Sequence, residues 1–210
     1  LRICLHGPWL ARLLLLALLL LPFPILATEE PAARFGIRLD EAWITLPDGV
    51  RLAADLYRPA DPQSGDAAEG PFPVLLEYLP YRKTEARSRN YGLYSYFVER
   101  GYVVARVDIR GTGNSEGRLI PHEYSDIEHQ DGEVVIDWLA GQPWSNGKVG
   151  MFGISWGGFN AIQMALRQPP ALGAILAVHA SDDLYHDDVR YIDGVLHLDR
   201  YALQIDHGNG

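Results

Sequence analysis

The stretch that decides the fold is VGMFGISWGGFN, residues 149–160, in which Ser155 stands between Gly153 and Gly157. Apolar residues lead into the serine as in a buried strand, and FNAIQMALRQ, residues 159–168, follows with the spacing of a helix. A G-x-S-x-G sequence between a strand and a helix predicts a sharp turn that exposes the serine hydroxyl above a sheet. We therefore interpret Ser155 as a nucleophile, the alternative being a structural serine in a glycine-rich turn.

The glycines and the helix after Ser155 both suit this interpretation. A side chain at Gly153 or Gly157 is expected to collide across the turn. The following helix directs its free amide groups at the place where an oxyanion would form, so the backbone N–H of Trp156 is the first candidate donor.

Strand-like and helix-like segments alternate on both sides of this turn. Strands are expected at residues 73–79, 102–109, 148–154 and 172–181, where apolar residues are nearly continuous. Helical spacing of apolar residues occurs at residues 91–101 and 124–142. Residues 35–59 alternate apolar and polar residues around Pro47, Asp48 and Gly49, which predicts an antiparallel hairpin. The order predicts an α/β fold with a mainly parallel sheet, helices on both faces and an antiparallel N-terminal edge.

The N-terminal segment has the composition of a secretory signal peptide. A basic start with Arg2 and Arg12 precedes a leucine-rich run, and Ala27 stands just before an acidic stretch. The alternative is an uncleaved membrane anchor, which Pro22 and Pro24 disfavour because they fall where a spanning helix would continue. We expect cleavage after Ala27 and export to the periplasm or the medium.

Charge and cysteine content narrow the range of partners. The chain has 18 Lys and Arg against 27 Asp and Glu, a formal net charge of −9, which becomes −11 when Arg2 and Arg12 are removed with the signal peptide. The only cysteine, Cys4, would leave with them, which suits an exported protein without disulfides or thiolate metal sites. So acidic a protein is not expected to bind nucleic acid or an anionic membrane.

Other short motifs match poorly. GQPWSNGKV, residues 141–149, has one residue too many for a phosphate-binding loop, and Val149 stands where a Ser or Thr would bind magnesium. GTGNSEG, residues 111–117, lacks the dinucleotide-binding spacing, so we interpret it as a loop over the active site. HDD at 186–188 and HLD at 197–199 could ligate a metal, but no second cluster accompanies them. We expect neither a cofactor nor a metal.

Serine chemistry also requires a base and an acid that orients it. His122 and His129 precede Ser155 and are interpreted as surface residues. In an α/β-hydrolase both groups follow the serine on loops beyond later strands, and only one strand is expected after it here. The available candidates, which no later strand positions, are Asp182, Asp183, His186, His197 and His207. A solvated acidic face is the simpler interpretation of this segment.

Several stretches, taken in order, carry a family pattern: DGVRLAADLYRP, PVLLEYLPYRK, FVERGYVVARVDIRGTGNSEG, DWLAGQPWSNGKVGMFGISWGG and ALGAILAVHASDD. They cover nearly all of residues 36–200 and resemble the CocE/NonD hydrolases, the group that contains the Xaa-Pro dipeptidyl-peptidase-like enzymes of peptidase family S15. The resemblance implies an α/β-hydrolase fold with a helical cap after the fourth parallel-type strand and a C-terminal jelly-roll domain. The family's catalytic Asp and His lie beyond the cap and have no matching position here.

The resemblance also implies roles for individual residues. Ser155 would be the nucleophile and the backbone N–H of Trp156 one oxyanion donor. The hydroxyl of Tyr81, in the Pro80-Tyr81 pair, would be the other donor, and a rigid phenol just past the end of a strand suits that role. Tyr78 is the competing candidate.

Two further features concern the surroundings of the site. Asp108, Arg110 and Gly111 match the family's D-x-R-G segment, which the resemblance implies braces the loop beside the site. The family often has tyrosine where Trp156 stands, a difference expected to alter the pocket wall and not the backbone donor.

These observations combine into one interpretation. Residues 1–27 are a signal peptide, residues 28–181 the N-terminal part of an α/β-hydrolase domain that is incomplete at its C-terminus, and residues 182–210 the start of a truncated helical cap. The predicted function is a serine hydrolase that cleaves ester or amide bonds, Xaa-Pro peptide bonds among them, through an acyl-enzyme on Ser155. The alternative is a truncated, catalytically inactive fragment that lacks the triad Asp and His. The expected partners are small ester, amide or short-peptide substrates, and the oligomeric state stays open.

Overall fold

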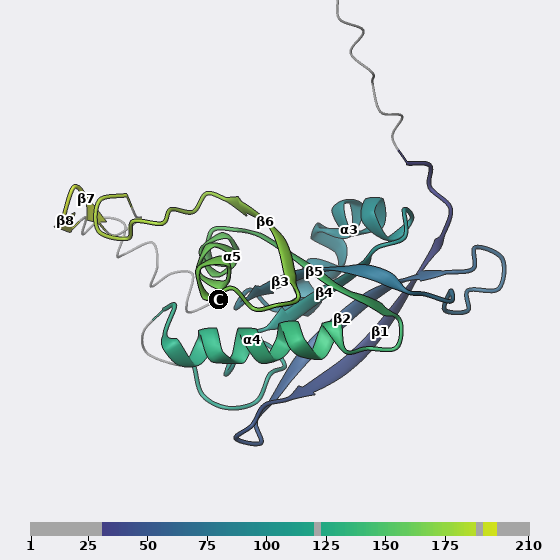
Figure 1. The fold of residues 1–210 in the computed structure, drawn as a ribbon, viewed down its shortest axis with the longest axis horizontal. Coiled ribbons are helices and arrows are strands. Elements are labelled where there is room, and N and C mark those ends of the chain that lie inside the picture. The colour runs from purple at the N-terminus through teal and green to yellow at the C-terminus, as the bar shows by residue number, and fades with distance from the viewer. Residues whose placement is uncertain (1–30, 120–122, 188–190, 197–210) are drawn as a thin grey trace, which may run out of the picture. The chain divides into compact units, whose positions relative to one another are not determined.

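The structure, a computed structural model, describes residues 31–119, 123–187 and 191–196. Its strands are β1 (Gly36–Thr45), β2 (Arg51–Ala60), β3 (Phe72–Leu79), β4 (Val103–Asp108), β5 (Ser145–Ile154), β6 (Leu172–Val178), β7 (Tyr191–Ile192) and β8 (Val195–Leu196). Its helices are α2 (Lys83–Arg89), α3 (Tyr91–Val98), α4 (Asp126–Ala140) and α5 (Trp156–Arg167). A six-stranded sheet in the order β1-β2-β4-β3-β5-β6 carries these helices (Figure 1).

The antiparallel N-terminal edge forms as the alternation of residues predicts. β1 and β2 pair from Gly36 opposite Ala60 to the other end of both strands, and β2 pairs antiparallel with β4. The turn between β1 and β2 is closed by the Asp48 carboxylate, which accepts from the N–H of Val50 at 3.1 Å. Gly49 has a φ of 88°, a conformation that a residue with a side chain rarely adopts.

The rest of the sheet is parallel, which brings the site together. β3 pairs with β4 and with β5, and β5 pairs with β6. The register places Leu79 opposite Asp108 and Ile154 opposite Val178. The carboxyl ends of these strands therefore meet at one edge of the sheet, where α/β proteins build their binding sites. The predicted fold class, an α/β-hydrolase sheet with an antiparallel N-terminal edge, is confirmed.

Helices cover both faces of the sheet. On one face α4 and α5 pack their apolar residues, among them Leu139 and Met164, against the inner residues of β3 and β5. On the other face α3 packs Tyr94 and Val98 against Tyr57 of β2 and the neighbouring β4. The two layers hold the sheet rigid beneath the turn at its carboxyl edge.

The sequence did not predict α2. Its residues, KTEARSR, are mostly polar, and only Lys83 and Ala86 are buried, so no apolar periodicity signals a helix.

Strand β6 differs from the inner strands of the sheet. It lies at the edge of the sheet, since within the described residues no strand pairs with its outer side, and apolar side chains on it such as Leu176 are exposed.

After β6 the described chain forms a separate pair of short strands, with Tyr191 opposite Leu196. The expectation of a helical cap over residues 182–210 stays a prediction, since only part of that range is described. The predicted signal peptide, residues 1–27, lies outside the described residues. Among the helices that the structure describes, none combines the length and apolar composition needed to cross a membrane.

Candidate active site

Ser155 lies on the sharp turn that the sequence predicts. It links the end of β5 to the start of α5 with φ 55° and ψ −119°, in the positive-φ region that residues with side chains avoid. The turn is held in place because the N–H of Ser155 donates to the carbonyl of Val178 at 2.9 Å. A strained serine at the carboxyl edge of a parallel sheet, followed at once by a helix, has the geometry of a nucleophile elbow.

The predicted collision across the turn is confirmed at Gly153 but not at Gly157, where an added Cβ would meet the side chain of Leu79, with Cδ2 at 2.8 Å. A Cβ atom at Gly153 would lie 2.5 Å from the carbonyl carbon of Gly157, which is rigid backbone. Gly158, whose constraint the sequence did not reveal, is equally restricted, because its Cβ would lie 2.8 Å from the carbonyl oxygen of Val178. These close approaches let α5 start directly against β5 and β6.

Replacing Gly153 with alanine is therefore expected to destabilise the fold by about 3 kcal/mol or more, because neither backbone segment can move aside. Gly173→Ala is the matched control. It lies in β6 with no atom within 4 Å of the added Cβ, so its effect should stay within about 0.5 kcal/mol. Urea unfolding of both variants measures the difference, and similar stabilities would contradict the crowding at Gly153.

Tyr81 is the tyrosine that faces the serine. Its hydroxyl lies 3.4 Å from Ser155 Oγ, and 45% of the residue is exposed, so its ring is not part of the core. Tyr78, the competing candidate, is only 1% exposed and its hydroxyl donates to the backbone carbonyl of Glu128 at 3.2 Å. The structure thus brings Tyr81, and not Tyr78, beside Ser155.

The loop that carries Tyr81 is fixed by a buried carboxylate at the end of β4. Asp108, fully buried, accepts from the N–H of Lys83 at 2.6 Å and from the N–H of Asn114 at 3.0 Å. Burial raises the pKa of Asp108, while these backbone donors oppose the rise. Asp108 therefore joins the loop after β3 to the loop after β4, in agreement with the bracing role that the D-x-R-G pattern implies.

Arg110 and Gly111 complete that brace. Arg110 donates to both oxygens of Asp131 in α4, at 2.7 and 2.8 Å, and to Asp48 of the N-terminal hairpin at 2.6 Å. A Cβ at Gly111, which has a φ of 73°, would lie 1.9 Å from the N atom of Leu119. Residues 111–117 thus form a tightly held loop beside the site.

A cluster of charges anchors the other side of the Tyr81 loop. Asp55, fully buried in β2, pairs with Lys83 Nζ at 2.6 Å and with Arg87 Nε at 2.7 Å, and Glu41 pairs with both cations from the edge. Burial alone would raise the pKa of Asp55, but the hydrogen bonds and charges of Arg87 and Lys83 lower it overall. The cluster ties α2, and with it the end of the Tyr81 loop, to the sheet.

Asp55→Asn is expected to destabilise the protein by about 3–5 kcal/mol at pH 7, because it leaves two cations without their buried partner. Since the folded-state pKa of Asp55 is lowered, its contribution is present above the unfolded pKa of about 4 and is lost as pH falls through the folded value. Urea unfolding at pH 7 and at pH near 3 checks this. The control Asp40→Asn, at partly exposed pairs with Arg38 and Arg58, should cost less than about 1 kcal/mol.

The side chain of Trp156 turns inward from the elbow. Its Nε1 donates to Glu128 of α4 at 2.7 Å, and its ring lies 5.2 Å from that of Tyr124. Asn160, one turn further along α5, donates to the same Glu128 oxygen at 2.8 Å. Glu128 and Asn160 were not singled out from the sequence. The S-x-x-E spacing of Ser125 and Glu128 signals a helix start, but only the fold shows the carboxylate buried against α5.

The candidate base and acid are not brought to Ser155 within the described residues. His129, expected at the surface, is 9% exposed in α4, and burial lowers its pKa; the expectation was wrong because α4 turns this face toward α5. His186 Nδ1 lies 2.7 Å from Asp183 Oδ2, an exposed pair three residues apart. His122, His197 and His207 lie outside the described residues. Where the structure describes the chain, it groups no set of His, Cys, Asp and Glu that could hold a metal ion.

The family model for X-Pro dipeptidyl-peptidase (S15 family) matches residues 48–208. The chain belongs to this family. Among curated S15-like relatives, the chain is similar to a cocaine esterase of Rhodococcus sp. (strain MB1 Bresler), 41% identical over 68% of this chain and 23% of the relative. It is also 30% identical to a putative Xaa-Pro dipeptidyl-peptidase of Streptomyces avermitilis, over 64% of this chain and 24% of the relative. The chain thus spans about a quarter of these relatives' length.

Solved structures agree with the S15 assignment. An α-amino acid ester hydrolase, 28% identical, superposes with a TM-score of 0.63 over 83% of this chain and 31% of its own. A CocE/NonD family hydrolase from Staphylococcus aureus, 22% identical, has a TM-score of 0.60 over 75% of this chain and 32% of its own, and supports the fold alone.

Proposed function

We propose that the protein is a serine hydrolase that cleaves ester or amide bonds through an acyl-enzyme on Ser155. The observation that carries the proposal is the strained elbow, which sets Ser155 Oγ 3.4 Å from the Tyr81 hydroxyl at the start of α5. The family and the relatives named as esterases and peptidases support the same reaction class.

The reaction follows from the groups at the elbow. Ser155 Oγ attacks the carbonyl carbon of the substrate while a base takes its proton. The carbonyl oxygen becomes an oxyanion that accepts from the Tyr81 hydroxyl and from the N–H of Trp156, one of the amides that has no acceptor within α5. Collapse of this intermediate expels the alcohol or amine, which takes the proton from the base. Water then hydrolyses the acyl-enzyme by the same steps.

The base and its orienting acid are proposed to come from a part of the complete protein that this chain does not include. The chain spans only about a quarter of the relatives' length, which supports this proposal. The Asp183 and His186 pair is the alternative within the chain, since its 2.7 Å contact resembles an acid and base dyad. Against that alternative, the hydrogen-bond contact of Ser155 Oγ among the described residues is with the Tyr81 hydroxyl.

An activity-based probe separates an active hydrolase from an inactive fragment. A fluorophosphonate is expected to label the protein encoded by the complete reading frame, and mass spectrometry of the peptides should place the adduct on Ser155. Labelling of this chain by itself would favour His186 as the base. Labelling of neither form would contradict the hydrolase.

The type of bond cleaved is a second question. Relatives carry the names of esterases and of Xaa-Pro dipeptidyl-peptidases, so both classes of substrate are candidates for this site. We favour small esters and amides, because the exposed Tyr81 and half-buried Ser155 are accessible to such groups. A panel of acyl esters, amino-acid esters and Xaa-Pro amides, tested on the complete protein, distinguishes them by kcat/KM.

Export is proposed from the first residues of the sequence. The basic start, the leucine-rich run and Ala27 support a signal peptide that is cleaved after residue 27. N-terminal sequencing of the protein recovered from the periplasm or the medium should begin at Thr28, whereas an intact N-terminus in the membrane fraction would indicate an anchor.

A further inference from the structure

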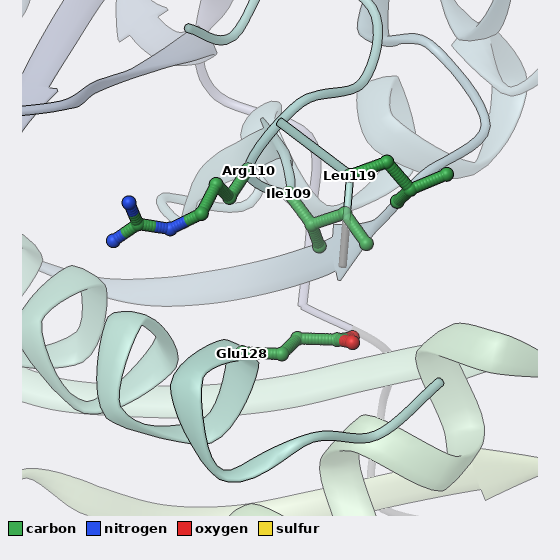
Figure 2. Close-up of a pocket in the computed structure, with 4 residues that line it drawn as sticks. All are labelled: Ile109, Arg110, Leu119 and Glu128. Carbon is green, nitrogen blue, oxygen red and sulfur yellow. The ribbon is translucent and has the colours of Figure 1, made fainter. Parts of the chain in front are cut away.

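The mechanism above makes no use of a buried acid close to the nucleophile. Glu128 lies in the first turn of α4 and is 5% exposed. It lines a cavity of about 10 Å³ together with Ile109, Arg110 and Leu119 (Figure 2). A buried carboxylate at this place requires a physical reason, because ionised groups are rarely buried without one.

The carboxylate joins α5 to the segment that leads into α4. One oxygen accepts from Trp156 Nε1 at 2.7 Å and from Asn160 Nδ2 at 2.8 Å. The other oxygen accepts from the N–H of Tyr124 at 3.2 Å, and the ring of Tyr124 packs against those of Trp156 and Phe159. The first turns of α5 are thus held from one side by a single acid and one aromatic ring.

Neutral groups make these hydrogen bonds. Figure 2 shows the guanidinium of Arg110 directed away from the Glu128 carboxylate. Arg110 Nε pairs instead with Asp131, at 2.7 Å. Burial raises the pKa of Glu128, the bonds from Trp156 and Asn160 oppose the rise, and the charge of Asp131 adds to it. With a raised folded-state pKa, any stabilising contribution is present below the unfolded pKa and is lost as pH rises. Ionisation of Glu128 therefore opposes folding, and the arrangement of its hydrogen bonds points to another role.

That geometry bears directly on the proposed oxyanion site. Trp156 carries the backbone N–H that would donate to the oxyanion, and the bond from its indole to Glu128 ties this residue, at the start of α5, to α4. Asn160, which shares the Glu128 oxygen, also donates to the carbonyl of Tyr78 at 3.1 Å, near the end of the strand that leads to Tyr81. The two oxyanion donors, from α5 and from the loop after β3, are linked through these bonds.

We propose that Glu128 is a positioning residue, which holds the start of α5 so that the Trp156 N–H and the Tyr81 hydroxyl converge on one oxyanion. This inference rests on the proposed hydrolase function. Misplaced donors weaken binding of the transition state more than binding of the substrate. A substitution of Glu128 is therefore expected to lower kcat and to leave KM nearly unchanged.

Glu128→Gln tests the role in the complete protein. The amide keeps the shape of the side chain but replaces one acceptor oxygen with an N–H donor. This new donor then faces either the N–H of Tyr124 or the donor groups of α5, and neither can accept a hydrogen bond from it. We expect kcat to fall about 10- to 100-fold while KM stays within about twofold. The rate at which a fluorophosphonate labels Ser155 should fall by a similar factor.

Trp156→Phe tests the same bond from the other side and keeps the test decisive if Glu128→Gln does not fold. It removes the indole N–H and leaves the backbone donor, and kcat should fall in the same direction. In the double variant the two losses should be less than additive, because both remove one interaction. Fully additive losses in kcat would overturn the proposal.

The matched control is Glu133→Gln. Glu133 lies on the same helix and also binds α5, but at its last turn, where it accepts from Arg167 Nε at 2.7 Å. The kcat of Glu133→Gln is expected to stay within about twofold of that of the unchanged protein, because the loss of an exposed ion pair has little effect.

Three further outcomes are decisive. If the folded fraction of Glu128→Gln, measured by circular dichroism, falls as much as its activity, the role is structural only and the proposal fails. If the unchanged protein cleaves no ester or amide and Ser155 is not labelled, the hydrolase function itself is wrong. Normal activity with an unaffected Glu128→Gln variant would overturn only the positioning role.

Discussion

Replacement of Ser155 with alanine is expected to lower kcat/KM of the complete protein by at least about 10³-fold, because the proposed acyl-enzyme forms on the Ser155 hydroxyl. The elbow leaves room for alanine, since the serine side chain caps no helix donor and its described contact is the 3.4 Å approach to Tyr81. Ester hydrolysis and fluorophosphonate labelling, measured side by side, check the prediction.

The control for this variant is Ser64→Ala. Ser64 lies on the exposed loop after β2, so its loss should change neither labelling nor kcat/KM. Residual activity in Ser155→Ala above about a tenth of the original would contradict the nucleophile assignment, since even partial disruption of such a unit is more costly.

Tyr81→Phe is expected to lower kcat by about 10²–10³-fold with little change in KM, the effect of removing one oxyanion donor. Stability should be unchanged, because the ring is 45% exposed and its hydroxyl faces Ser155 and not the core. Steady-state kinetics on the complete protein, together with the thermal midpoint, separate the two effects.

Tyr91→Phe serves as the control, since Tyr91 is exposed on α3 and makes no part of the proposed site. A Tyr81→Phe variant that raises KM and keeps kcat would show that Tyr81 binds substrate without stabilising the oxyanion. In that case the second oxyanion donor would be a backbone amide or a residue outside this chain.

Much of the fold could be predicted from local pattern. The hairpin around Asp48 and Gly49, the buried strands and the elbow at Ser155 each follow from residues close together in the chain. Such features depend on backbone sterics and on short-range periodicity, which a sequence displays directly. The S-x-x-E signal at Ser125 likewise marks the start of α4.

Features that depend on distant partners could not be predicted. α2 forms although its residues are polar, because Lys83 and Arg87 pair with Asp55, which lies far earlier in the chain. His129 is buried because α4 turns it toward α5, and an amphipathic pattern does not specify which polar residues fall on the covered side. Glu128 is a hydrogen-bond acceptor for α5 only once the two helices lie together.

The sequence by itself predicted the candidate reaction centre: a serine on a strained turn between a strand and a helix, with glycines where backbone segments approach too closely for a side chain. Only the tertiary structure decided which tyrosine lies beside the serine. Tyr78 points from β3 into the layer beneath α4, while Tyr81, past the strand, is turned toward Ser155 by the loop that Asp108 holds. The physical reason is that register and packing between distant segments, and not local preference, set the direction of a side chain at the end of a strand.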